Sequence, residues 1–134
     1  LHSLDSLRLL EEVQAEGVRL GRKIPLLLEV NISGDAAKHG FSPAEMPAAI
    51  EAAARLDHLE VRGLMSMAGL DTDAATARGQ FAAVRELRDQ LATNLPGNVS
   101  LRDLSMGMSG DFREAIAEGA TLVRIGSSFF EGVV

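Results

Sequence analysis

The sequence predicts an α/β fold with a parallel sheet, and two observations carry this prediction. Short apolar runs rich in branched residues alternate along the chain with stretches whose apolar residues repeat at helical spacing. No long linker, low-complexity segment or close repeat interrupts this alternation. Strands that alternate with helices are joined by right-handed crossovers, and they therefore run parallel.

Two architectures fit the alternation: an open doubly wound sheet and a TIM-type (β/α)8 barrel. The chain has 134 residues and about four strand–helix units, which corresponds to half of such a barrel. A dinucleotide-binding sheet would carry Gly-x-Gly-x-x-Gly after its first strand, and no such motif follows residues 24–30. The missing motif favours the half barrel.

The first half of the chain is expected to hold a helix, a strand and a second helix. Ser3 can cap the first helix, and Gly21 is suited to end it. The nearly continuous apolar run at 24–33 predicts a strand that is buried on both faces. Ser42 and Glu45 have the spacing of a capping box, which begins the second helix.

The second half of the chain continues the same alternation. Its longest helix carries apolar residues at helical spacing and ends at a Pro-Gly-Asn sequence. The expected elements are a strand at 59–67, a helix from 71–73 to 95, a strand at 101–106, a helix at 111–118 that Gly119 stops, and a strand at 121–126.

The composition excludes several classes of protein. The net charge is −6 and no basic run is present, so nucleic acid is not an expected partner. Without cysteine there are no disulfides and no thiolate metal sites, and the three histidines lack metal-ligand spacing. The longest apolar run is too short to span a membrane, and no secretory signal is visible. We expect a cytoplasmic protein.

Two clusters of small residues, SMGMSG at 105–110 and RIGSS at 124–128, each follow an apolar run. In parallel α/β folds, ligands bind at the carboxyl ends of the strands. Glycine lets backbone N–H groups approach an anion, serine adds donors, and a helix beginning near Gly110 presents free N–H groups. Arg124, on the opposite face of its strand from its two apolar neighbours, adds a cation. The clusters predict one phosphate site, with simple turn formation as the alternative.

Five motifs along the chain resemble the YggS/PROSC family of pyridoxal 5′-phosphate (PLP) homeostasis proteins: LLLEVNIS, KHGF, VRGLMSM, LSMGMSGDFREAI and VRIGSSFF. The resemblance covers essentially the whole chain. It implies a fold-type III PLP protein similar to the barrel domain of alanine racemase, with residues 1–134 forming the C-terminal half of that barrel. The implied function is that of a PLP carrier in intracellular vitamin B6 and amino-acid balance, with no catalytic residue and no metal.

The resemblance also implies the residues of the PLP site. The cofactor phosphate would be held by Ser109 and by the turn of Gly126 and Ser127, and Arg124 would face the pyridine nitrogen. An arginine there disfavours protonation of the ring nitrogen, so PLP becomes a weaker electron sink. The expected cofactor-binding residues are Ser105, Met106, Ser109, Arg124, Gly126 and Ser127.

The lysine that forms the family's Schiff base has no counterpart in this chain. The family carries it on the first barrel strand, and neither Lys23 nor Lys38 matches its position. PLP binding is therefore expected to be non-covalent at best. A half barrel would also expose two strand edges and its inner apolar surface, which predicts either self-association or a place within a longer protein.

Three other functions stay open at this point. The first is a PLP-dependent amino-acid racemase, although the chain has no tyrosine for a two-base mechanism. The second is a barrel enzyme that binds a sugar phosphate, for which Glu29 and Asp103 are the nearest carboxylates, both expected early or midway in their strands. The third is a scaffold without activity of its own.

Overall fold

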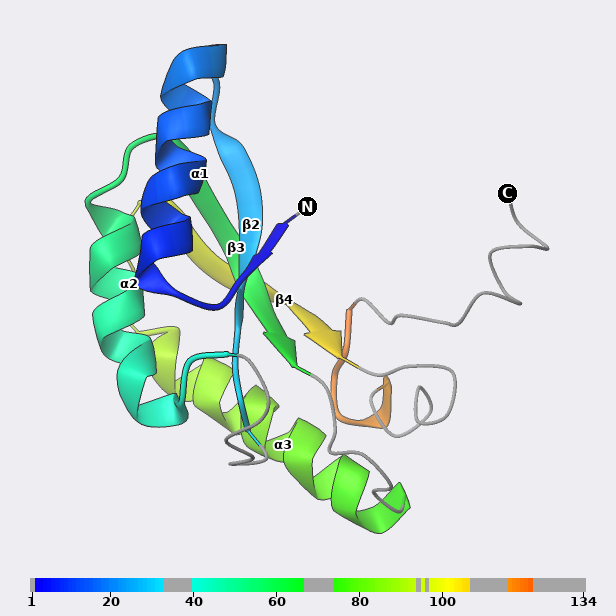
Figure 1. Cartoon of the computed structure of the whole chain (residues 1–134). Coiled ribbons are helices and arrows are strands. Elements are labelled where there is room, and N and C mark those ends of the chain that lie inside the picture. Colours follow the sequence, from blue (N-terminus) through cyan, green and yellow to red (C-terminus); the bar gives the residue numbers. More distant parts are fainter. Residues whose placement is uncertain are drawn as a thin grey trace, which may run out of the picture.

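Four parallel strands form one sheet, and their order in space is their order in the sequence. The computed structural model describes residues 2–32, 40–66, 74–93, 95, 97–106 and 116–121. Neighbouring strands pair in the order β1-β2-β3-β4, and all three pairs are parallel (Figure 1). The strands are β1 (His2–Leu4), β2 (Ile24–Glu29), β3 (Leu59–Ser66) and β4 (Val99–Met106).

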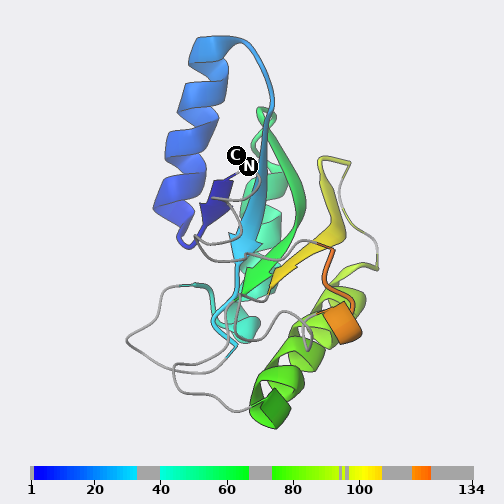
Figure 2. The ribbon, with the colours of Figure 1, turned by 90° about the vertical axis from the view of Figure 1, so that its right-hand side faces the viewer.

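The described helices pack against one face of this sheet. Figure 1 shows α1 and α2 beside the sheet and α3 beneath it, and the turned view of Figure 2 shows α2 behind the strands. A doubly wound sheet carries helices on both faces and reverses its strand order at a switch point. Sequential parallel strands with helices on one face are the winding of a (β/α)8 barrel, so the predicted α/β barrel segment is confirmed. The helices are α1 (Leu7–Leu20), the 3-10 turn η1 (Pro43–Glu45), α2 (Met46–Ala54) and α3 (Ala74–Leu91).

Two of the predicted helix boundaries are confirmed by their hydrogen bonds. Gly21 ends α1 with a φ of 67°, which glycine adopts without strain, and its N–H donates to the carbonyl of Val18. The Ser42 hydroxyl accepts from the Glu45 N–H at 3.3 Å, and the Glu45 carboxylate accepts from the Ser42 N–H at 2.9 Å. This reciprocal pair is the capping box that the sequence predicts.

The amino-terminal residues differ from the prediction. Ser3 lies in β1 instead of capping a helix, and the N-cap of α1 is Ser6, whose hydroxyl accepts from the Leu9 N–H at 3.2 Å. A strand of three residues is too short to show a period of two, so only its pairing with β2 reveals it. The chain therefore begins its alternation with a strand, and β4 begins at Val99, two residues before the predicted 101.

The structure describes only part of the predicted elements after residue 106. Residues 116–121 include the end of the predicted helix, and Gly119 turns there with a φ of 96° while its N–H donates to the carbonyl of Ile116. This turn agrees with the predicted stop at Gly119. The predicted helix start at 111 and the remainder of the strand at 121–126 lie outside the described residues.

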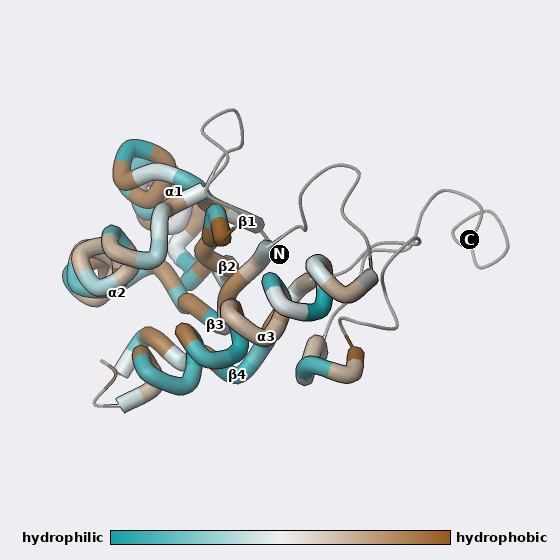
Figure 3. The backbone as a smooth tube through the Cα atoms, turned by 90° about the horizontal axis from the view of Figure 1, so that it is seen from below, coloured by the Kyte–Doolittle hydropathy of each residue, from teal (hydrophilic) through white to brown (hydrophobic). Residues whose placement is uncertain are grey.

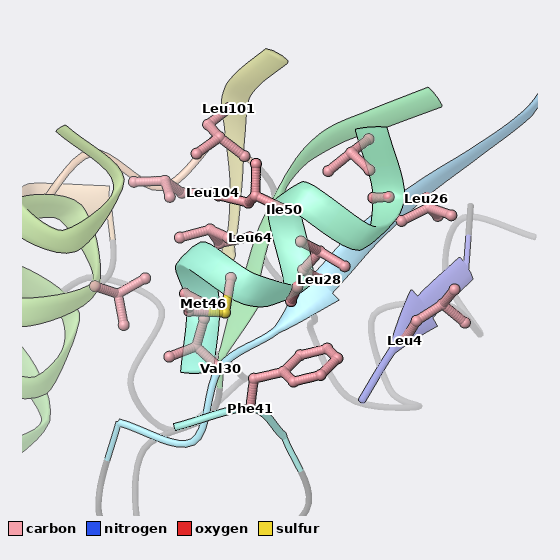
Figure 4. Packing of buried hydrophobic residues seen from close by; sticks show 14 of the residues in the cluster. Leu4, Leu26, Leu28, Val30, Phe41, Met46, Ile50, Leu64, Leu101 and Leu104 are labelled. Carbon is pink, nitrogen blue, oxygen red and sulfur yellow. The ribbon is translucent and has the colours of Figure 1, made fainter. Parts of the chain in front are cut away.

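The core lies between the sheet and the helices. Leu28, Leu64 and Leu104 are paired neighbours across β2, β3 and β4, and each is fully buried. Met46 and Ile50 of α2 pack over them (Figure 4). Figure 3 shows hydrophobic stretches in the strands and alternating hydrophobic and hydrophilic positions around the helices, as expected for helices with one apolar side.

Gly63 lies at a close backbone contact between β3 and β4. The β3–β4 register shifts between Val61 and Gly63, so the irregularity lies beside this glycine. A Cβ atom on Gly63 would stand 1.9 Å from the carbonyl oxygen of Asp103, a distance that atoms cannot adopt. Glycine is required here because of space and not because of its backbone angles.

Candidate cofactor site

The carboxyl ends of β2, β3 and β4 bring Glu29, Met65 and Ser105 into one row. The register pairs Glu29 with Met65 and Met65 with Ser105. The leucine row one residue earlier packs under the helices, and side chains alternate along a strand. The row therefore lies on the opposite face of the sheet, which we call the inner face because it corresponds to the interior of a barrel.

Two of the six predicted site residues lie in the described part of the chain. Ser105 lies on the inner face and is only 6% exposed. Met106 is fully buried on the helix side, so its side chain packs in the core and only its backbone is available at the strand end. The other four predicted residues, Ser109, Arg124, Gly126 and Ser127, lie outside the described residues.

The loop that follows β2 is closed at its base by Gly40 and Phe41. The Asn31 N–H donates to the Phe41 carbonyl and the Phe41 N–H donates to the Glu29 carbonyl, both at 2.8 Å. Gly40 has a φ of 121°, and a Cβ there would stand 2.8 Å from the Asn31 nitrogen. This closure fixes the backbone next to Glu29. The Gly-Phe pair of the KHGF motif is a signal of this closure in the sequence, but the closure was not predicted. Lys38, from the same motif, lies outside the described residues.

Glu29 lies closer to the strand end than expected. The sequence predicts Glu29 early or midway in a strand that runs to residue 33, whereas β2 ends at Glu29. Its carboxylate therefore belongs to the carboxyl end of the sheet, where barrel ligands bind.

Thr121 starts the next segment of the chain beside β4. Its N–H donates to the Leu104 carbonyl at 3.0 Å, and its hydroxyl accepts from the Leu104 N–H at 2.9 Å. The same hydroxyl donates to the Asp103 carboxylate at 3.3 Å. These contacts hold Thr121, three residues before the second cluster in the sequence, against the strand that carries Ser105.

Glu118 is held by two arginines of α3. Its carboxylate accepts from Arg78 Nε at one oxygen and from Arg85 Nη1 at the other, each at 2.7 Å. The Glu118 side chain is 10% exposed. The hydrogen bond from Arg78, together with the positive charges of Arg85 and Arg78, lowers the pKa of the Glu118 carboxyl although burial opposes the shift. This ion-pair cluster was not predicted from the sequence, because Glu118 lies 33 residues from Arg85 and 40 residues from Arg78.

The opposite end of the sheet holds a polar hollow of about 250 Å³. Lys23 lies there, directly before the first residue of β2, and so does Ser100 at the start of β4. Ser100 and Ser105 are five residues apart on one strand, which is roughly 16 Å at 3.3 Å per residue. Lys23 is therefore far from the row of Glu29, Met65 and Ser105. The hollow is lined by Lys23, Glu60, Gly97, Asn98, Ser100 and Arg102.

The described part of the chain holds neither a metal-ligating cluster nor a membrane-spanning helix. No group of three or more His, Asp or Glu side chains in the described ranges could hold a metal ion. None of the helices within those ranges combines the length and the apolar character needed to cross a membrane.

Comparison with known proteins identifies the family. Residues 1–132 match the alanine racemase N-terminal domain. The pyridoxal phosphate homeostasis protein of Pseudomonas aeruginosa is 38% identical over 130 residues, which cover 97% of this chain and 54% of that protein. The homeostasis protein of Aquifex aeolicus is 39% identical over 130 residues, which cover 97% of this chain and 56% of that protein. The chain thus spans about half the length of the curated relatives it matches.

A solved structure of a relative agrees with these matches. PipY of Synechococcus elongatus, in its structure with PLP bound, is 38% identical and superposes with a TM-score of 0.86 over 96% of this chain and 59% of PipY. The chain belongs to the alanine racemase N-terminal domain family, and its predicted resemblance to the pyridoxal phosphate homeostasis proteins is confirmed.

Proposed function

We propose that this chain binds PLP at the carboxyl ends of its strands, as part of a protein that holds and delivers the cofactor within the cell. The observation that carries the proposal is the row of Glu29, Met65 and Ser105 on the inner face, which lies where barrel proteins bind their ligands. The chain is also similar over nearly its whole length to PipY in its structure with PLP bound. The pyridoxal phosphate homeostasis proteins that it matches support the same function.

The donors at this end of the sheet fit a phosphate ester. Ser105 carries a hydroxyl on the inner face, and Thr121, three residues before the second cluster in the sequence, is bound to Leu104, the neighbour of Ser105 on the same strand. In our proposal, Ser109 and the Gly126–Ser127 turn donate hydrogen bonds to the phosphate, because serine hydroxyls and glycine N–H groups suit a close approach to an anion. Met106 contributes through its backbone alone.

When bound, PLP supplies a reactive aldehyde and an electron-accepting ring. We assign Arg124 to the ring nitrogen. A guanidinium stays charged and accepts no proton, so it disfavours protonation of that nitrogen. This residue set binds and orients the cofactor without favouring carbanion chemistry. We therefore propose a carrier and not an enzyme.

The position of Lys23 supports binding without covalent attachment through this lysine. This lysine lies at the amino ends of the strands, across the length of the sheet from Ser105. It cannot reach a cofactor held by the two clusters. We accordingly propose that Ser109, Gly126, Ser127 and Arg124 hold PLP through hydrogen bonds and charge.

Equilibrium binding of PLP to the whole chain tests the proposal. We expect saturable binding that inorganic phosphate displaces and that Ser109→Ala and Arg124→Ala each weaken about tenfold, the cost of one charge-assisted hydrogen bond. Ser100→Ala, at the other end of β4, is the matched control and should bind like the parent chain. Binding no tighter than that of an unrelated lysine-containing protein would refute the proposal.

One observation favours a second candidate, a barrel enzyme that acts on a sugar phosphate. Glu29 ends β2 on the inner face, where a carboxylate could serve as an acid or base. Such an enzyme would bind a sugar phosphate more tightly than PLP and lose turnover in Glu29→Gln. A carrier would prefer PLP, and Glu29→Gln would leave its PLP affinity within about threefold.

We also propose that copies of this chain associate with one another. The described helices cover only one face of the sheet, and β1 is an edge strand within the described residues. Light scattering of the chain in solution should give a mass above that of one 134-residue copy. A monodisperse monomer would contradict self-association.

A further inference from the structure

The segment 116–121 is fastened at two points to different elements of the fold. Glu118 is bound to α3 through Arg78 and Arg85, and Thr121 is bound to β4 through Leu104. Only Gly119 and Ala120 lie between the two points, so both ends of a very short piece of chain are fixed. The second cluster, which carries three of the six proposed PLP contacts, begins three residues after Thr121 in the sequence.

Arg78 and Arg85 fix the orientation of the Glu118 carboxylate in addition to attracting its charge. Arg78 and Arg85 are seven residues apart, which places them two turns apart on one side of α3. Each guanidinium takes a different carboxylate oxygen at 2.7 Å. A carboxylate with one donor can rotate about that donor, whereas separate donors on its two oxygens prevent this rotation.

The two residues that follow Glu118 also contact the rest of the fold, which fixes the path of the backbone from Glu118 to Thr121. Gly119 turns at a φ of 96°, and a Cβ there would lie 3.7 Å from Arg85 Cδ, so the turn rests on the stem of the arginine that binds Glu118. Ala120 packs against the apolar core. The direction of the chain at Thr121 therefore depends on where α3 holds Glu118.

We propose that Glu118 is a positioning residue of the cofactor site: its ion pairs with Arg78 and Arg85 couple α3 to the second cluster and thereby set the affinity for the phosphate group. This inference rests on the proposed function, because it assigns phosphate binding to the cluster that follows Thr121. Glu118 itself touches no ligand in this scheme. Its effect passes through the backbone of 118–121.

The test compares the parent chain with Glu118→Gln, which keeps the shape of the side chain and removes its charge. Two quantities are measured: the dissociation constants of PLP and inorganic phosphate, and the hydrogen-exchange rate of the Thr121 amide without ligand. We expect both dissociation constants to rise roughly fivefold to tenfold, in the range of a residue that acts through others. We also expect faster exchange at Thr121, with unchanged exchange at the Val30 amide of the sheet.

Two further variants keep the test valid if Glu118→Gln folds poorly. Arg78→Gln removes one of the two donors and should give a smaller rise in the dissociation constants, because Arg85 still holds the carboxylate. Glu12→Gln removes the exposed Arg8–Glu12 ion pair on α1 and serves as the matched control, with both readouts unchanged.

The outcomes separate this inference from the proposed function. If the parent chain binds PLP and Glu118→Gln binds it equally well, the positioning role is overturned and the proposed function stands. Unchanged exchange at Thr121 also overturns it, because the ion pairs then do not order the segment. If the parent chain binds neither PLP nor phosphate, the proposed function and this inference both fail.

Discussion

The two faces of the sheet use the same strands for different purposes. On the helix side, Leu28, Leu64 and Leu104 are fully buried and join one apolar cluster with the helices. One residue later, on the inner face, the row holds a carboxylate, a thioether and a hydroxyl. A shift of a single residue along three strands therefore separates the leucines that pack in the core from the polar side chains at the carboxyl ends of the strands.

The two faces also differ in what their residues depend on. The leucine row depends on the volume of its neighbours, because a buried apolar side chain loses free energy when a cavity forms beside it. The row of Glu29, Met65 and Ser105 depends on register, because its three side chains meet only while β2, β3 and β4 stay aligned. Substitutions on the helix side should therefore change mainly the stability of the fold, and substitutions on the inner face should change mainly ligand binding.

The largest loss of stability is expected at Gly63, because both faces of the sheet depend on the close contact between β3 and β4 there. Gly63→Ala places a Cβ 1.9 Å from the Asp103 carbonyl oxygen, so β3 and β4 must separate. We expect a loss of at least about 3 kcal/mol in the free energy of unfolding, at the upper end for overpacked sites. Urea titration followed by circular dichroism measures it.

Gly79→Ala is the matched control for this substitution. Gly79 lies in α3, and no neighbouring atom lies within 4 Å of the point that an alanine methyl group would occupy there. Alanine should therefore raise the stability by up to about 1 kcal/mol. Equal effects at Gly63 and Gly79 would show that the close β3–β4 approach has no energetic consequence.

The next effect compares two neighbours on β4. Leu104→Ala should cost about 3 kcal/mol of stability through loss of buried volume, while PLP affinity per folded molecule stays the same. Ser105→Ala should cost less than about 1 kcal/mol of stability but raise the PLP dissociation constant roughly fivefold. Urea titration and equilibrium binding on both variants measure the two effects, and weaker binding by folded Leu104→Ala than by Ser105→Ala would contradict the division between the faces.

A smaller effect is expected at the amino ends of the strands, where Asn98 joins α2 to the sheet. Its side-chain amide donates to the carbonyls of Ala53, Leu56 and Leu59 at 2.9, 3.1 and 3.3 Å. Asn98→Ala leaves these carbonyls without that donor, so we expect a loss of about 2 kcal/mol. Thermal unfolding measures it. PLP affinity should not change, since Asn98 is at the end of the sheet away from Ser105, and a change would contradict the assignment of the site.

The sequence predicted those parts of the fold that depend on near neighbours. The capping box at Ser42 and the end of α1 at Gly21 follow from residues within one turn of each other. The three longer strands follow from apolar runs that are long enough to show a pattern. By contrast, β1 is recognised only through its pairing with β2, and the need for glycine at position 63 follows from a register shift that no local pattern encodes.

The candidate site was predicted only where its residues follow a local pattern in the sequence. The carboxyl end of β4 was found because Gly and Ser follow an apolar run, and Ser105 lies there on the inner face. The side chain of Met106 belongs to the core, and the alternation from Leu104 could have indicated this. The ion pairs of Glu118 join residues far apart in the sequence, and charged residues are common on helices, so no pattern marked them.

The smallest expected effect is a change of stability with pH that arises from Glu118. The arginines lower the pKa of its carboxyl in the folded chain, so the carboxylate form stabilises the fold above the ordinary glutamic acid pKa of about 4.3. As the pH falls below that value and then through the lowered pKa, this contribution is lost. The stability difference between the parent chain and Glu118→Gln should therefore be constant near neutral pH and shrink toward zero in acid. Urea titrations at a series of pH values measure it, with Glu12→Gln giving a small difference throughout because its ion pair is exposed. A difference that stays flat into acid would mean that the shape of the Glu118 side chain, and not its charge, holds the segment to α3, and added salt would then leave that difference unchanged as well.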